Sequence, residues 1–183
     1  MRQLRYSVAA SLDGFIAGPN GEFDWITIDP EIDFAGMYAG VSGLVMGRRS
    51  YEVMKATGGP EGPTLPTYVY SRTLPEGERD GVTFVRDAVS HVRTLKETDG
   101  KPLWLWGGSS LFRELAGAGL VDAVEVALIP ILLGDGVPLL GGPSPRVPLK
   151  LRAHRLYKAS GTMSLEYDVV SGRHSKLLES FTP

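Results

Sequence analysis

The chain has 183 residues, of which 43% are hydrophobic and 22% are charged, as expected for one soluble globular domain with a sizeable core. Its 19 Lys and Arg residues against 21 Asp and Glu residues give a net charge of -2, and no basic run is long enough to follow a nucleic acid, so we expect no nucleic-acid partner. The chain has no cysteine and its three histidines are scattered, which excludes disulfides and thiolate chemistry and argues against a metal site.

The first ten residues hold two arginines and only a short apolar stretch, which does not resemble a secretory signal. We therefore expect a cytoplasmic protein with no membrane segment. One domain is predicted to cover residues 1–170, followed by a polar tail over residues 171–183.

Short apolar runs alternate with segments of helical periodicity along most of the chain. The predicted strands cover residues 6–10, 43–46, 67–71, 82–85, 102–106 and 124–128. Predicted helices cover residues 30–40, follow Gly47, contain Ala88 to Leu95, and run from Ser109 to Ala118. Near the C-terminus, residues 154–159 and 162–170 flank Ser160-Gly161, which predicts a β-hairpin. The order predicts an α/β fold of three layers, αβα, with a mostly parallel central sheet and a C-terminal antiparallel hairpin.

Two of the predicted strand-to-helix junctions are rich in glycine: residues 46–50 (MGRRS) and residues 106–110 (WGGSS). Each places bare backbone and unpaired helix N–H groups at the carboxyl edge of a parallel sheet, where an anion is favoured. Such glycines can also serve turn geometry alone, but two junctions together suit a pyrophosphate. Ser71 and Arg72 end a third strand with a hydroxyl and a guanidinium, a pair suited to a phosphate monoester.

The remaining motifs provide little evidence for a function. No glycine pattern of a Rossmann dinucleotide site or of a triphosphate-binding loop follows any strand, and no Ser/His/Asp set can be assembled. Asp29, Glu31 and Asp33 cluster where the first helix is predicted to begin, and stabilisation of the helix start explains them more readily than catalysis does. Trp104 and Trp106 are predicted to pack in the core.

Four segments in order resemble motifs of a known family. They are residues 10–17 (ASLDGFIA), 46–52 (MGRRSYE), 106–109 (WGGS) and 130–136 (PILLGDG). They are similar to motifs of the riboflavin-biosynthesis reductases, the C-terminal domain of the bacterial bifunctional deaminase-reductase, within the dihydrofolate-reductase-like fold. The resemblance spans about residues 2 to 170 and corresponds to a stand-alone reductase domain, because the chain lacks the length and the cysteines for a zinc deaminase.

The resemblance implies a site for NADPH. In it, Gly47, Arg48 and Ser50 hold the cofactor phosphates, Ser71 and Arg72 lie by the 2′-phosphate, and residues 107–109 cover the pyrophosphate. The residues implied to bind the cofactor are Ala9, Ala10 and Ile16 beside the nicotinamide, then Gly47, Arg48, Ser50, Ser71, Arg72, Gly107, Gly108 and Ser109. A cis peptide between Gly107 and Gly108 is also expected by this resemblance.

The function implied is NADPH-dependent hydride transfer to a small pterin-, pyrimidine- or carbonyl-type substrate. No segment matches the asparagine and arginine residues expected to grip a ribose phosphate. The alternative is a non-catalytic NADPH-binding or regulatory module of the same fold, whereas a purely structural interaction domain leaves the phosphate-suited sites unexplained.

Catalytic and partner residues follow from the same reasoning. Glu31 or Asp33 is predicted to face the nicotinamide pocket and to support substrate binding or protonation, and their helical spacing lets only one of them do so. Asp13 is the alternative candidate for this role.

A homodimer is predicted through the apolar strand at residues 124–129 together with residues 130–133.

Overall fold

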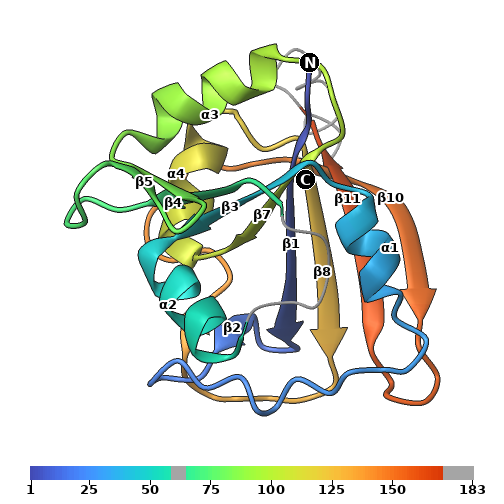
Figure 1. Ribbon diagram of the computed structural model, residues 1–183. Helices are drawn as coiled ribbons and strands as arrows, with labels where there is room; N and C mark the ends of the chain where they lie inside the picture. The colour runs from blue at the N-terminus through green and yellow to red at the C-terminus, as the bar shows by residue number, and fades with distance from the viewer. Residues whose placement is uncertain (59–64, 171–183) are drawn as a thin grey trace.

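The computed structural model of the protein describes residues 1–58 and 65–170 (Figure 1). The helices in these residues are α1 (Phe34–Ala39), α2 (Arg48–Ala56), α3 (Ala88–Glu97) and α4 (Ser109–Gly117). The strands in these residues are β1 (Leu4–Ser11), β2 (Phe15–Ala17), β3 (Gly43–Gly47), β4 (Thr67–Tyr70), β5 (Gly77–Arg79), β6 (Val82–Val85), β7 (Leu103–Gly107), β8 (Ala123–Ile129), β9 (Val137–Pro138), β10 (Leu149–Leu156) and β11 (Met163–Val169). None of the described helices is long and apolar enough to cross a membrane.

The central sheet has nine strands in the order β10-β11-β8-β1-β7-β3-β4-β6-β5. The strands from β8 to β6 in this order run parallel to one another, and β5 pairs antiparallel with β6. The C-terminal hairpin of β10 and β11 pairs antiparallel with β8, and Figure 1 shows it as the orange and red edge of the sheet. The mostly parallel sheet and the antiparallel hairpin are therefore confirmed.

Helices cover both faces of the sheet because successive strand residues point to opposite sides. Val45 packs with residues of α3 and α4 in the larger core cluster, which includes Leu111 and Leu115. Its neighbours Leu44 and Met46 pack instead with residues of α1 and α2 in a second cluster. The three-layer αβα architecture is thus confirmed, with α3 and α4 on one face and α1 and α2 on the other.

The first helix is shorter than predicted, because it begins at Phe34 and not at Pro30. Asp33 is its N-cap, and the Asp33 carboxylate accepts the backbone N–H of Gly36 at 2.8 Å. Before it, the carboxylate of Asp29 accepts the N–H of Glu31 and the Asp29 carbonyl accepts that of Ile32, which forms a separate turn. Because the side chains of these aspartates accept backbone N–H groups, the helix begins one turn later than predicted.

The hairpin and the edges of the sheet also differ from the sequence-based expectation. Strand β10 begins at Leu149 and ends at Leu156, since residues 157–162 form a turn closed by the N–H of Gly161 on the carbonyl of Tyr157. Strands β2, β5 and β9 have two or three residues each and were not predicted, because so short a strand leaves no alternating pattern. The predicted tail at residues 171–183 lies outside the described residues.

Candidate functional site

The glycine junctions meet at one edge of the sheet, where its parallel strands end. Strands β1, β7, β3 and β4 are neighbours in that order. Their carboxyl ends therefore place Ser11, residues 107–109, residues 47–50 and residues 71–72 side by side along this edge. Segments that lie up to about 100 positions apart in the sequence form a continuous row, of the kind in which α/β sheets bind ligands.

Both helices that start at this edge have free N-termini. Gly47 precedes α2 and Gly108 precedes α4, and in the described chain no side chain caps either helix. A Cβ atom added to Gly47 would meet nothing within 4 Å, so the space in front of α2 is open. A Cβ on Gly107 would lie 3.0 Å from Oγ of Ser50, which shows that the two junctions touch. Uncapped N–H groups of two adjacent helices suit a diphosphate.

The expected cis peptide between Gly107 and Gly108 is wrong: this bond is trans. Gly108 instead has a φ of 109°, a conformation that L side chains rarely adopt. The positive φ turns the chain from β7 into α4 without a cis bond.

Side chains of the phosphate-suited residues are partly engaged in the protein itself. The buried hydroxyl of Ser109 accepts the N–H of Gly141 at 2.6 Å, and that of Ser71 accepts the N–H groups of Thr73 and Leu74. These two serines therefore shape their loops. Arg48 lies 3.5 Å from Glu52 one turn along α2, and both side chains are half exposed.

Arg72 is a strongly exposed cation of this row. Its side chain is 85% exposed, and its guanidinium lies 3.7 Å from the carboxylate of Glu114 on α4. The interaction crosses from the end of β4 to α4, so a group bound between these elements would contact both residues.

The predicted nicotinamide residues occupy both faces of β1. Ala10 is buried in the larger core cluster and Ile16 packs against it, whereas Ala9 points to the face that carries α1. Ala9 pairs with Ala127 of β8, and Ala127 pairs with Ser164 of β11. These three small residues form a low floor across the sheet, next to the carboxyl edge.

The three predicted catalytic carboxylates do not come together. Asp13 accepts the hydroxyl of Ser11 at 2.6 Å and the backbone N–H groups of Leu133 and Gly134, and these hydrogen bonds, that of Ser11 first, lower the pKa of Asp13. Asp33 caps α1, as described above. Glu31 lies 2.8 Å from the guanidinium of Arg155 on β10, with both side chains exposed by more than half.

Asp29 has a structural role that the sequence did not reveal. It is 1% exposed, and its two carboxylate oxygens accept the backbone N–H groups of Glu31 and Ser160, each at 2.9 Å. These hydrogen bonds, that of Glu31 first, lower the pKa of Asp29. Asp29 thereby ties the segment before α1 to the turn of the C-terminal hairpin. The Asp29-Pro30 pair predicts a turn, but it does not predict the contact with Ser160, which lies 131 positions away.

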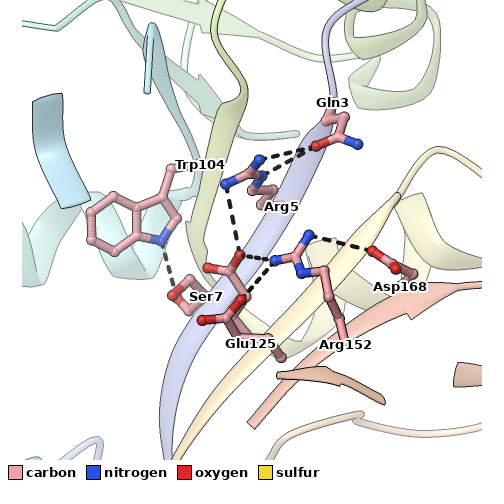
Figure 2. A network of polar contacts seen from close by, with 8 residues as sticks. Gln3, Arg5, Ser7, Trp104, Glu125, Arg152 and Asp168 are labelled. Carbon is pink, nitrogen blue, oxygen red and sulfur yellow. Dashed lines mark hydrogen bonds and ion pairs between the residues drawn. The ribbon is translucent and has the colours of Figure 1, made fainter. Parts of the chain in front are cut away.

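A charged network on the α1 face of the sheet was also missed (Figure 2). Arg152 of β10 contacts three carboxylates: Glu125 at 3.2 Å, Glu166 at 2.9 Å and Asp168 at 3.4 Å. Arg5 of β1 lies 3.9 Å from the same oxygen of Glu125. The signal in the sequence was a charge inside an apolar strand, as at Arg5 between Leu4 and Tyr6, but it does not identify the partner.

A cavity of about 220 Å³ lies between this network and α1. Helix α1 and the segment after it contribute one wall, and the sheet contributes the other. The lining residues are Arg5, Ser7, Gly36, Met37, Gly40, Val41, Trp104, Glu125, Arg152 and Glu166. Trp104 is buried as predicted, its indole N–H donates to the carbonyl of Ser7 at 3.1 Å, and its ring packs against Tyr38. Trp106 packs partly buried against the second core cluster, also as predicted.

Comparisons with known proteins agree with the resemblance seen in the motifs. A family model described as the RibD C-terminal domain matches residues 2–164. The uncharacterized protein YyaP of Bacillus subtilis is 30% identical over 178 residues, which cover 91% of this chain and 94% of YyaP.

Two solved structures illustrate the fold. The deaminase/5-amino-6-(5-phosphoribosylamino)uracil reductase of Thermotoga maritima matches with a TM-score of 0.73 at 20% identity, over 92% of this chain and 57% of that chain. Dihydrofolate reductase of Enterococcus faecalis, solved in complex with NADP(H), matches with a TM-score of 0.65 at 18% identity, over 92% of this chain and 97% of that chain. The predicted dihydrofolate-reductase-like fold is confirmed.

Proposed function

The chain belongs to the RibD C-terminal domain family, and from this premise we propose that it is an NADPH-dependent reductase that acts on a small molecule. The observation that carries the proposal is the row of junctions along the sheet edge, with two uncapped helix N-termini in contact and a cation at one end. This row fits a dinucleotide with an additional phosphate. The NADP(H) complex of the Enterococcus protein, which shares the fold, supports the same assignment.

The order of strands sets the proposed orientation of the cofactor. The N–H groups that start α2 and α4 bind the diphosphate, and Gly47, Gly107 and Gly108 keep side chains out of the way. Arg72 binds the 2′-phosphate at the β4 end of the row. The nicotinamide end then lies at the carboxyl end of β1, bordered by Ala9.

When bound, NADPH supplies a hydride, and the protein positions the group that receives it. We propose that the substrate lies on the floor of Ala9, Ala127 and Ser164, on the face that carries α1. Arg155 is paired with Ser164 in the hairpin register, so Glu31, which contacts Arg155, lies beside the same row of residues. Among the predicted carboxylates we therefore favour Glu31 for substrate binding or protonation.

A second candidate is the NADPH-binding module without catalysis. It is favoured by one observation: Asp13, Glu31 and Asp33 each have a structural partner in the protein. Under this alternative, the site binds the cofactor and the carboxylates only hold the loops.

Two measurements separate these functions. Titration of the protein with NADPH and with NADH, followed by fluorescence, tests cofactor binding. Pterins, flavin precursors and small carbonyl compounds are then screened for oxidation of NADPH. We expect tight NADPH binding and turnover with at least one class of compound. Binding without turnover across the screen favours the second candidate, and absence of NADPH binding excludes both.

We also propose a homodimer, but through a different surface than the sequence suggested. Strand β8 cannot form an interface, because it is paired with β1 on one side and with β11 on the other and its valines are buried. Of the predicted surface, Leu132 in the segment after β8 is exposed. We favour instead the edge strand β10, which has three exposed leucines: Leu149, Leu151 and Leu156. An edge strand with exposed apolar side chains is a surface on which subunits pair.

A further inference from the structure

The cavity beside α1 has two chemically different walls. Met37, Val41 and the indole of Trp104 supply apolar surface. Arg5, Glu125 and Arg152 supply charged groups from three strands of the sheet, which Figure 2 shows converging at one place. A space with one apolar wall and one charged wall suits a small organic molecule that carries a polar group at one end.

The charges of the network do not balance. Two guanidinium groups, of Arg5 and Arg152, face three carboxylates, of Glu125, Glu166 and Asp168, which leaves one negative charge in excess over the whole network. Asp168 does not line the cavity, where Glu125 and Glu166 are the two carboxylates. Every nitrogen-to-carboxylate contact of these two arginines to Glu125 reaches the same oxygen, Oε1. Within the described residues, no hydrogen bond reaches Oε2 of Glu125 or Oε1 of Glu166. The cations are thus satisfied, while acceptor oxygens remain.

The cavity adjoins the proposed substrate floor. Ser7 lines it, lies two residues before Ala9 on the same face of β1, and is in register with Glu125 of β8. A molecule that rests on Ala9 and Ala127 can therefore reach the network with its far end. This step rests on the proposed function, since it takes the substrate position from the reductase assignment.

We propose that this cavity receives the end of the substrate that carries a protonated nitrogen group, such as an ammonium, an amidinium or a protonated heteroaromatic ring. Glu125 is its principal acceptor, because its side chain is 22% exposed and one of its oxygens has no partner in the described chain. A carboxylate or phosphate in the same place would lie against Glu125 and Glu166, and we expect it to bind more weakly than a cation. Substrate selectivity then comes from charge at this wall.

The protonation behaviour of Glu125 agrees with this role. Burial, the largest influence, raises the pKa of its carboxyl group, although Arg5 and Arg152 oppose the shift. A bound cation in the cavity offsets that desolvation and stabilises the ionised form.

The test uses two small probes of the same shape and opposite charge, benzamidine and benzoate. Binding is followed by the indole N–H signals of the three tryptophans in 15N-labelled protein, with the Trp104 signal assigned through Trp104→Phe. We expect benzamidine to shift the Trp104 signal and benzoate to leave it unchanged. In Glu125→Gln, benzamidine affinity should fall about tenfold or more, the size expected for one charge-assisted hydrogen bond. Glu97→Gln on α3, on the opposite face of the sheet, is the matched control and should bind as the unaltered protein does.

Three results would overturn the proposal: equal or tighter binding of benzoate, a benzamidine shift that avoids Trp104, or undiminished binding by Glu125→Gln. The comparison of the two probes on the unaltered protein needs no variant, so it decides even if Glu125→Gln fails to fold. NADPH titration of the same samples tests the reductase assignment separately from the cavity. If the unaltered protein does not bind NADPH, the reductase assignment is contradicted. The two probes report on the cavity alone.

Discussion

The guanidinium group of Arg72, which follows strand β4, lies 3.7 Å from the carboxylate of Glu114 on helix α4. Because Arg72 is 85% exposed and Glu114 is 41% exposed, the pair contributes little to the stability of the fold. Its consequence is for binding: if Arg72 holds the 2′-phosphate of NADPH, then Glu114 places a negative charge beside that phosphate. Glu114 should therefore weaken the binding of NADPH and leave the binding of NADH unaffected.

We predict that Glu114→Gln tightens NADPH binding by roughly threefold to tenfold, as expected for removal of one nearby like charge at a solvated site. Arg72→Ala should weaken the binding of NADPH and bring its affinity close to that of NADH. Dissociation constants for both cofactors at low and high salt provide the measurement, with Glu97→Gln as the control. An unchanged ratio of the two affinities in both variants would remove Arg72 from the 2′-phosphate site.

A second prediction concerns the contact between the two glycine junctions. Gly107→Val should abolish NADPH binding, because its Cβ would lie 3.0 Å from Oγ of Ser50 and its methyl groups would fill the approach to both helix starts. Gly108→Ala should be less stable than the unaltered protein, since φ at this position is 109°. Circular dichroism must show that Gly107→Val is folded, and tight NADPH binding by that folded variant would contradict the diphosphate site.

The junctions could be found in the sequence because each is a local motif. Gly47 and Gly107 end apolar strands just before helical patterns, and strand order then brings them together. The start of α1 could not be found in the same way. Pro30 favours a first helical turn, but the backbone N–H groups of Glu31 and Gly36 donate to the carboxylates of Asp29 and Asp33, which overrides it.

No local pattern in the sequence could predict the charged network. Arg5 and Glu125 are each the one charged residue of their own strand, whereas β10 contains Lys150 and Arg155 besides Arg152. Arg5, Glu125 and Arg152 meet only because β1 pairs with β8, β8 with β11, and β11 with β10, in one particular register. A bulge in β10 between Leu151 and Ala153 places Arg152, and a bulge leaves no periodic signal in the sequence.

A third prediction is that Asp29→Ala lowers the midpoint of thermal unfolding at neutral pH, because two backbone N–H groups lose their acceptor. The lowered pKa of Asp29 means that the folded state favours the ionised form. Its contribution is therefore complete above the ordinary pKa of 3.8 and is lost as the pH falls through the lowered value. The difference between Asp29→Ala and the unaltered protein should shrink in strong acid. The exposed Asp24→Ala is the control, and a difference that does not vary with pH would argue against this linkage.

A fourth prediction addresses the dimer. Leu151→Glu places a charge in the middle of the exposed leucines of β10, where Leu151 is 50% exposed, and should convert a dimer to a monomer. Leu132→Glu, at a position that is 69% exposed in the region first indicated by the sequence, should leave the dimer intact. Light scattering at micromolar concentration measures both. A monomeric unaltered protein rules out the dimer. If Leu132→Glu disrupts the dimer and Leu151→Glu does not, the interface lies in the segment after β8.

The last prediction concerns the source of the proton. Hydride transfer to a C=N or C=O group requires a proton as well, and a carboxyl group within reach of the substrate could deliver it. Asp33 is committed to the N-cap of α1, and Asp13 to the N–H groups of Leu133 and Gly134. Only Glu31 has a side-chain partner, Arg155, in the row of residues that contains the proposed floor.

We therefore predict that Glu31→Gln lowers turnover on the order of a hundredfold, within the range for a lost general acid, and changes its pH dependence while NADPH affinity stays constant. Asp33→Asn should keep turnover, because asparagine is as good an N-cap as aspartate. Asp13→Asn should act through the stability of the loop that follows β8, visible as a lower unfolding midpoint. Once a substrate is known, rates against pH for the three variants decide the matter. If Glu31→Gln retains the unaltered rate and pH profile, Glu31 only anchors Arg155, and if all three variants do so, the proton comes from water.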